Sequence, residues 1–204
     1  MSRKDHWENV YKKKSPIEVS WYQSKPSISL SIISSLSIEK DENLIDVGGG
    51  ASTLVDYLLE EGFKNISILD LSSNALEQAK KRLGEKSKLV NWQAEDVTNY
   101  SPKKTYSLWH DRAVFHFLTE RSDKEKYKKV LESSVRVGGY VIIAAFSIGG
   151  PKKCSGLDIV QYDAEKIRRE LGQNYKLIEE KSESHVTPDG KEQLFGYNVF
   201  TKIA

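Results

Sequence analysis

The sequence predicts an α/β fold built on a largely parallel sheet. From residue 43 onward, short apolar runs typical of buried strands alternate with amphipathic segments typical of helices, and this alternation produces a parallel sheet covered by helices. A glycine-rich turn joins the first strand to the next helix. At the C-terminus, Tyr175–Lys181 and Leu194–Thr201 are strand-like runs separated by a Pro-Asp-Gly turn at residues 188–190, which indicates an antiparallel hairpin at the sheet edge.

The first 40 residues are predicted to form a helical segment, and residues 41–204 a single compact domain. Within the serine-rich stretch Ser24–Ser37, isoleucine and leucine residues recur at helical spacing. Aromatic residues gather just upstream, ending with Trp21 and Tyr22. They either fold over a binding site as a lid or cover the sheet as part of a packed helix, and composition does not separate the two.

The parallel strands are predicted from five apolar runs of ordinary strand length. They lie near Asn43–Val47, Ile66–Leu69, Leu89–Gln93, Tyr106–Trp109 and Tyr140–Phe146.

Four amphipathic segments are predicted to be helices. They lie near Ser52–Glu61, Ser73–Leu83, Asp123–Val135 and Ala164–Leu171. Gly62 and Gly84 follow the first two, where a left-handed residue commonly ends a helix. Ser122 with Glu125 has capping-box spacing for the third helix, and Asp163 is the expected N-cap of the fourth.

Composition excludes several classes of protein. The chain has 204 residues, of which 38% are hydrophobic and 29% charged, with no apolar run near the ~20 residues that a membrane span needs. A net charge of +2 with scattered basic residues makes nucleic acid an improbable partner. Because the N-terminus has no apolar export segment and Cys154 is the single cysteine, we expect a cytoplasmic location.

The most informative stretch runs from Asp46 to Ser52, where a strand ends and a helix begins. Its three consecutive glycines are Gly48, Gly49 and Gly50. Glycines at such a turn let a ligand approach the main chain closely, whereas a turn without a ligand would leave three in a row unexplained. A dinucleotide fingerprint would require a third glycine at the position of Thr53. Because a carboxylate at Asp46 suits an amino group or sulfonium better than a pyrophosphate, the expected ligand carries positive charge.

A second acidic residue, Asp70, ends the second strand twenty residues after Gly50. A carboxylate there can accept both ribose hydroxyl protons. Taken alone, Asp70 would be read as a helix-initiating residue ahead of Ser72, but its spacing from the glycine turn favours a cofactor contact, together with the adjacent Leu71.

The glycine turn resembles the D/E-x-G-x-G-x-G motif of class I S-adenosylmethionine-dependent methyltransferases, with Ser52 in place of the third glycine. This resemblance implies a Rossmann-like three-layer αβα sandwich, a mostly parallel seven-stranded sheet, S-adenosylmethionine as cofactor and S-adenosylhomocysteine as product. Residues 93–98 resemble the third motif of the class. That implies that Asp96 accepts from the adenine amino group while the Val97 amide donates to the ring, although Asp96 is equally suited to a turn.

The fourth strand leads into polar and aromatic residues at the carboxyl edge of the sheet, where we expect the methyl acceptor. His110 is a candidate proton acceptor or cofactor contact, Asp111 could orient a cationic amine, and Arg112 could hold an anionic group. An alternative is a salt bridge between Asp111 and Arg112 with structurally packed histidines. His110 and His116 have no cysteine or carboxylate at ligand spacing, so no metal is expected.

Further motifs resemble small bacterial class I methyltransferases related to eukaryotic protein-lysine methyltransferases. They are Trp-x-x-x-Tyr at residues 7–11, Glu-Val-Ser-Trp-Tyr at 18–22 and Asp-Arg-Ala at 111–113. The resemblance implies in-line methyl transfer to a nucleophile such as a protein lysine. The lysine enzymes often carry Tyr or Phe three positions after the acidic residue, where this chain has Val114, so a small-molecule thiol or amine acceptor stays open.

Two other functions remain alternatives at this stage. One is an NAD-dependent oxidoreductase, which Thr53 and Asp46 argue against. The other is a non-catalytic cofactor-binding module, which nothing in the sequence excludes. The sequence does not indicate an oligomeric state.

Overall fold

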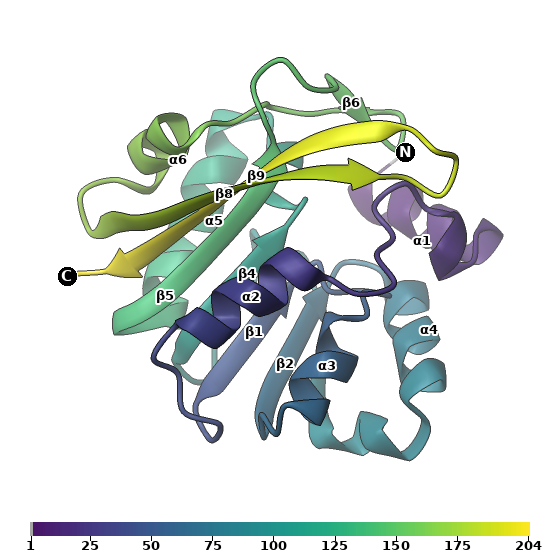
Figure 1. Ribbon diagram of the computed structural model, residues 1–204, viewed down its shortest axis with the longest axis horizontal. Helices are drawn as coiled ribbons and strands as arrows, with labels where there is room; N and C mark the ends of the chain where they lie inside the picture. The colour runs from purple at the N-terminus through teal and green to yellow at the C-terminus, as the bar shows by residue number, and fades with distance from the viewer. Residues whose placement is uncertain (1) are drawn as a thin grey trace.

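A computed structural model describes residues 2–204. A seven-stranded sheet lies at the centre of the molecule, with helices on either side (Figure 1). The strand order is β3-β2-β1-β4-β5-β9-β8. The strands are β1 (Asn43–Val47), β2 (Asn65–Asp70), β3 (Val90–Ala94), β4 (Tyr106–Arg112), β5 (Val135–Phe146), β8 (Tyr175–Val186) and β9 (Glu192–Lys202). Strands β1 to β5 pair in parallel, and β9 runs antiparallel to both β5 and β8. The predicted mostly parallel sheet with a C-terminal hairpin is confirmed.

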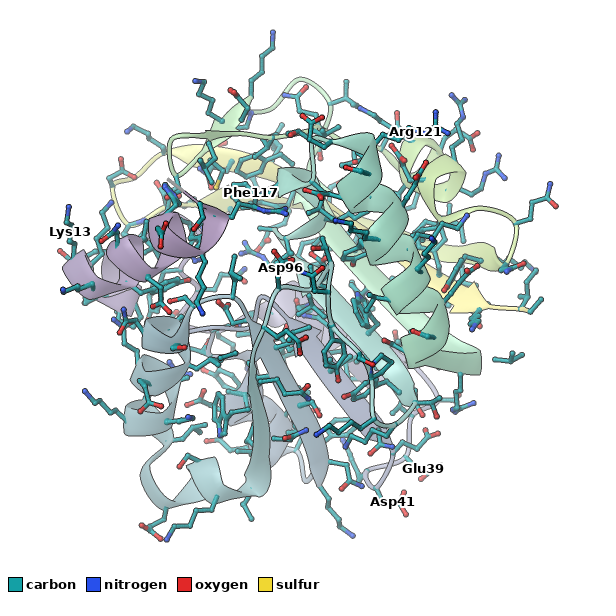
Figure 2. All side chains as sticks on the ribbon, turned by 180° about the vertical axis from the view of Figure 1, so that it is seen from behind. Lys13, Glu39, Asp41, Asp96, Phe117 and Arg121 are labelled. Carbon is teal, nitrogen blue, oxygen red and sulfur yellow. The ribbon has the colours of Figure 1, made fainter. Side chains whose placement is uncertain are left out.

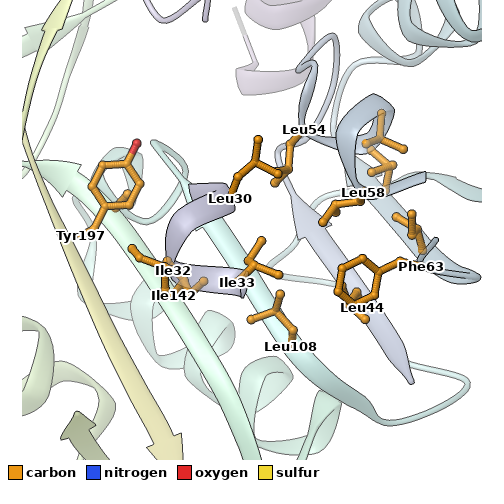
Figure 3. Close-up of a cluster of buried hydrophobic side chains, with 14 of the residues drawn as sticks. Leu30, Ile32, Ile33, Leu44, Leu54, Leu58, Phe63, Leu108, Ile142 and Tyr197 are labelled. Atoms are coloured by element: carbon orange, nitrogen blue, oxygen red, sulfur yellow. The ribbon is translucent and has the colours of Figure 1, made fainter. Parts of the chain in front are cut away.

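Helices cover both faces of this sheet. They are α2 (Ser27–Ser35), α3 (Leu54–Glu60), α4 (Ser73–Leu83), α5 (Arg121–Ser134) and α6 (Ala164–Leu171). Successive strand residues point to opposite faces, so Leu44 packs with α2 and α3 in one apolar cluster (Figure 3) while Ile45 packs with α5 and α6 in another. The three-layer αβα arrangement follows from these two clusters.

The predicted helix ends agree with the structure in three places and fail in one. Gly62 and Gly84 both adopt positive φ after their helices, and the Asp163 carboxylate accepts from the Lys166 amide at 2.7 Å. The capping box at Ser122 was wrong. Because α5 already begins at Arg121 with Glu120 as its N-cap, Ser122 lies inside the first turn and cannot cap it.

Several element boundaries also differ from the prediction. The glycine turn extends to Thr53, so α3 begins at Leu54 rather than Ser52. Strand β5 begins directly after α5, at Val135, and both hairpin strands are longer than their apolar cores. A short hairpin of β6 (Lys153–Cys154) and β7 (Leu157–Asp158) was not predicted, because two-residue strands carry almost no periodicity.

The N-terminal region contains three elements: α1 (Arg3–Lys13), the short 3₁₀ helix η1 (Pro16–Glu18) and α2. Helix α2 contributes Leu30, Ile32 and Ile33 to the core of the sheet (Figure 3). Helix α1 instead packs beside α4 (Figure 1). Across residues 2–204, no helix combines the length and apolar character needed to cross a bilayer.

Candidate active site

The candidate site lies where the strand order reverses. Strands β1 and β4 are neighbours, and their following loops diverge toward β2 and β5, which opens a crevice at the carboxyl ends of the strands. Two adjoining cavities occupy this crevice, and four residues line both: Tyr11, Trp21, Gly48 and Arg112.

Most of the predicted site residues line these cavities. Those in the first cavity are Trp21, Gly48, Asp70, Leu71, Asp96, Val97 and Arg112. Those in the second cavity are Trp21, Tyr22, Asp46, Gly48, Gly49, Ser52, His110 and Arg112. Gly50 and Asp111 lie outside both linings, so the structure brings together all but two of the predicted residues.

The three glycines are held in close contact with their surroundings. Gly48 and Gly50 have positive φ values of 67° and 31°, which side chains rarely adopt. A Cβ atom on Gly48 would overlap Val114, and one on Gly50 would come within 2.6 Å of an Asp70 carboxylate oxygen. The loop therefore leaves no room for larger residues, and it contributes Gly48 to both cavities and Gly49 to the second.

Ser52 fits the loop although it replaces a glycine of the resembled motif. Its hydroxyl accepts from the Leu54 amide at 3.1 Å, which satisfies one of the free amides at the start of α3. The Arg82 guanidinium donates to the carbonyls of Ala51 and Ser52 at 2.9 and 2.6 Å. These contacts fix the end of the loop from the side of α4.

Asp46 takes part in a buried polar chain. Its Oδ1 atom lies 2.7 Å from His110 Nδ1, and His110 Nε2 lies 2.9 Å from the Ser29 hydroxyl. Within the described residues, the other carboxylate oxygen of Asp46 has no hydrogen-bond partner although it is buried. Because buried polar atoms are normally paired, this oxygen is free to accept from a ligand in the second cavity.

Asp70 is buried at the end of β2. Its Oδ1 atom accepts from the Ser72 amide at 2.7 Å, and burial, reinforced by the charges of Asp46 and Glu8, raises its pKa to about 7. The N-cap of α4 is Ser72, whose hydroxyl accepts from the Ala75 amide. The helix-initiating role that Asp70 might have played is therefore filled by Ser72.

Asp96 takes the turn conformation that was one of the two roles predicted for it from the sequence. Its Oδ1 atom accepts from both the amide and the hydroxyl of Thr98, at 2.9 and 2.7 Å, while Oδ2 lies 3.7 Å from the Arg3 guanidinium. Val97 is buried beside it. Asp96 is among the residues that line the first cavity, and Figure 2 shows where it lies on the molecule.

Asp111 points into the protein rather than into either cavity. It accepts from the Val114 and Phe115 amides at 2.9 and 3.2 Å and from the Tyr127 hydroxyl at 2.7 Å. Burial raises its pKa to about 6. Its carboxylate holds the turn after β4, where Ala113 has a positive φ of 68°.

Arg112 does not pair with Asp111, so the alternative salt bridge between these neighbours was wrong. Because adjacent strand residues face opposite ways, Arg112 points into the cavities. Its partner is Glu183 on β8, with Nη2 3.5 Å from Oε2. The same guanidinium donates to the Tyr197 hydroxyl at 2.8 Å and to the Trp21 carbonyl at 3.1 Å.

Aromatic side chains wall the first cavity on the side of α1. The Trp7 ring meets those of Trp21 and Phe117 edge to face, with centroids 5.5 and 5.1 Å apart, and Trp21 Nε1 donates to the Tyr11 hydroxyl at 3.2 Å. Figure 2 shows Phe117 beside α1. The sequence placed aromatic residues upstream of the sheet but did not indicate Phe117 as their partner.

Other site residues had no local signal in the sequence. Glu183 and Tyr197 belong to the C-terminal hairpin and reach Arg112 only through the fold. Ser29 lies 81 residues from His110 along the chain. Only a long-range pattern between residues could have revealed these contacts.

His116 is a buried packing residue. Its ring meets that of Phe117 edge to face and packs at a tilt against that of Phe146, and burial beside the Arg112 charge lowers its pKa to about 3. Among residues 2–204, no group of three or more histidine, cysteine, aspartate or glutamate side chains is arranged to hold a metal ion.

Comparison with known proteins identifies the same region of the chain. The sequence model of the family described as "Methyltransferase domain" matches residues 45–141. A malonyl-[acyl-carrier protein] O-methyltransferase of Ilyobacter polytropus is 33% identical over 110 residues, which cover 53% of this chain and 39% of that protein. EEF1A lysine methyltransferase 2 of Danio rerio is 24% identical over 160 residues, covering 71% of this chain and 69% of that protein. The chain thus spans about two fifths of the first of these relatives.

Solved structures share the fold. The N-methyltransferase NodS of Bradyrhizobium japonicum, in complex with S-adenosylhomocysteine, has a TM-score of 0.72 at 14% identity and covers 97% of this chain and 99% of its own. A methyltransferase of Anabaena variabilis has a TM-score of 0.77 at 15% identity, covering 99% and 96%. At these identities the likeness concerns the fold alone.

Fold and site together are those of a class of proteins that bind a nucleoside cofactor on a Rossmann-like sheet. The family match over residues 45–141 and the methyltransferase relatives support the class I S-adenosylmethionine-dependent methyltransferases, as the sequence predicted. The residues present fit this cofactor, because the buried Asp46 oxygen without a partner suits an amino group, and Gly48 and Gly49 line the same cavity with backbone that a ligand can approach closely. The matched relatives favour this class over the NAD-dependent alternative.

Proposed function

We propose that the protein transfers the methyl group of S-adenosylmethionine to an amine nitrogen, and that this amine belongs to a lysine side chain of a protein. The observation that carries the proposal is the charge balance where the acceptor would lie. Trp7, Trp21 and Phe117 present aromatic rings there. The cation Arg112 is offset by Glu183.

The offset of the Arg112 charge by Glu183 favours an amine acceptor, because methyl transfer to a neutral amine conserves the positive charge in the site. When bound, the cofactor supplies an electrophilic methyl group on a positively charged sulfur. Attack by a neutral amine moves that positive charge to nitrogen without cancelling it, and aromatic faces stabilise such a cation by ~0.5–2 kcal/mol. An anionic nucleophile would instead be helped by a cation without a counter-charge, and Arg112 has its counter-charge in Glu183.

The predicted residues take roles consistent with their positions. We assign the cofactor's amino group to the free oxygen of Asp46, its ribose to Asp70 and its adenine to the turn at Asp96 and Val97. His110 is 4% exposed and holds Asp46, so we infer that it orients this carboxylate. Asp111 holds the turn after β4 and acts as a positioning residue.

The region before β1 is proposed as a lid whose open position admits cofactor and acceptor. Glu8 on α1 accepts from the Ser73 and Asn74 amides at the start of α4, at 2.8 and 3.1 Å. Trp21 and Tyr22 line the cavities from the segment that follows. Apart from the small cluster around Trp7 and Tyr11, the contacts of α1 are polar, whereas α2 lies in the large apolar core. We therefore expect α1 and residues 14–24 to be the part that moves.

A second candidate acceptor is a carboxylate carried on a protein. It is favoured by the 33% identity to an enzyme that methylates a malonyl group on its carrier protein. In this alternative Arg112 would hold the anionic acceptor, as the sequence analysis anticipated for an anionic group.

Transfer of a radioactive methyl group distinguishes the two acceptors. The purified protein is incubated with labelled S-adenosylmethionine and a proteome from which small molecules have been removed. We expect label that survives mild base and is released as methyllysine after acid hydrolysis. Label lost to base would identify an ester and the second candidate, while label that appears only after the small-molecule fraction is added back would overturn both. Gly48→Ala serves as the control without a cofactor site.

A further inference from the structure

Arg112 is the cation that lines both cavities. Among the described residues, Glu183 is the one acidic side chain that forms an ion pair with it. Arg112 and Glu183 have side chains only 10% and 15% exposed. Charges at such a depth are weakly screened. The charge of the Glu183 carboxylate therefore decides how strongly the Arg112 guanidinium acts on a charged ligand inside the cavities.

The hydrogen bonds around Glu183 fix it in this place. Its Oε2 atom accepts from the Tyr197 hydroxyl at 2.8 Å, and its Oε1 atom accepts from the Gln23 amide at 2.6 Å. The Tyr197 hydroxyl also accepts from Arg112 Nε at 2.8 Å. Carboxylate and guanidinium are thus bridged by a shared hydroxyl as well as by their direct contact.

We infer that Glu183 is a positioning residue that cancels the charge of Arg112, so that the cavities accept a sulfonium cofactor as readily as its neutral product. S-adenosylmethionine carries a positive sulfur, whereas S-adenosylhomocysteine carries a neutral thioether and is otherwise alike. Without the Glu183 charge, the guanidinium would repel the first ligand and leave the second nearly unaffected. Glu183 therefore sets the ratio of the two affinities. This inference depends only on cofactor binding and holds whichever acceptor the protein uses.

The test measures both dissociation constants by calorimetry for wild type and for Glu183→Gln, which keeps the shape and removes the charge. We expect the affinity for S-adenosylmethionine to fall about tenfold and that for S-adenosylhomocysteine to change less than about twofold. Tyr197→Phe is the matched control, since it breaks the same cluster without changing charge and should shift both affinities equally. Glu183→Asp should restore the wild-type ratio.

A merely structural role would lower both affinities together in Glu183→Gln, and that result would overturn the inference, as would an unchanged ratio. If Glu183→Gln fails to fold, Arg112→Gln provides the reverse test. Removing the cation leaves the Glu183 charge in excess, so the ratio should then shift toward S-adenosylmethionine by about the same factor. A ratio that stays at the wild-type value in Arg112→Gln would contradict the inference equally.

Discussion

The two ends of the first cavity are built in different ways. At the end formed by β1, β2 and β3, the predicted contact residues lie at the carboxyl end of a strand or within two residues of it: Gly48, Asp70 and Asp96. At the other end the wall combines α1, the segment around Trp21, the turn after β4 and the short β6, which contributes Cys154. One end thus depends on the local conformation of three turns, and the other on contacts between segments far apart in the chain.

This difference predicts where single substitutions act most strongly. Turns that follow buried strands are held by the sheet itself, so we expect a change there to act directly on cofactor binding. The other end is held by many weak contacts between segments that are far apart in the chain. Losing one of these contacts should change the mobility of the segment that made it more than the shape of the cavity.

The largest effect is expected at Gly48. Its φ of 67° and the overlap that a Cβ would make with Val114 mean that Gly48→Ala displaces the loop. We expect the affinity for S-adenosylhomocysteine to fall by about 100-fold or more, because Gly48 lines both cavities. Isothermal calorimetry measures this.

Gly62 provides the matched control for this substitution. It also has positive φ, 87°, but nothing lies within 4 Å of its missing Cβ. Gly62→Ala should cost about 1 kcal/mol in the free energy of unfolding and leave the dissociation constant unchanged. Equal losses of affinity in the two variants would show that the loop does not carry the cofactor.

The same contrast explains how much the sequence could predict. The glycine loop, Asp70 and Asp96 were found because their signal is contiguous: an apolar strand followed by a special turn. Glu183 was missed, since its partners Gln23 and Arg112 lie 160 and 71 residues away. Asp111 was found as a residue but given a catalytic role. The direction of its side chain depends on strand register, which a polar residue at a strand end does not reveal.

Asp111 should show a large effect on stability. Its carboxylate accepts three hydrogen bonds, of which two are buried and that from the Val114 amide is partly buried. Asp111→Ala therefore leaves three donors without this partner and should lower the free energy of unfolding by about 3 kcal/mol. Asp111→Asn keeps an oxygen for the two amides and should cost less than half as much. Chemical denaturation measures both. Wild-type stability in Asp111→Ala would mean that the turn after β4 holds without it.

Asp70 should make stability and cofactor affinity respond to pH in opposite directions. Its pKa is raised to about 7 in the folded protein, above the unfolded value near 3.8. Its contribution to stability is therefore complete below about pH 4 and is lost as pH rises through 7. The ribose hydroxyls need the ionised form, so the affinity for S-adenosylhomocysteine should fall about tenfold from pH 8 to pH 6.

Asp70→Asn isolates this contribution from other groups, including Asp111, whose pKa is also raised. The variant should lose the pH dependence of binding between pH 6 and 8 while keeping a low affinity throughout. Its stability should depend less on pH than that of the wild type between pH 4 and 7. A binding curve in wild type that is flat across this range would exclude Asp70 as the titrating ribose acceptor.

The smallest effect is expected where α1 meets α4. Glu8 accepts from two amides and from the Ser72 hydroxyl at the start of α4, so Glu8→Ala removes the contacts that would hold α1 closed over the site in the proposed lid. For Glu8→Ala we expect a loss of only about 1 kcal/mol in the free energy of unfolding, but about tenfold faster hydrogen exchange at the backbone amides of Arg3–Lys13. The dissociation rate of S-adenosylhomocysteine should rise by a similar factor, because a lid that opens more often releases its ligand more often. Glu85→Ala, which removes an exposed contact with Lys88, should change neither rate. If exchange in α1 quickens while the dissociation rate stays at the wild-type value, α1 is a packed helix over the sheet and not the lid.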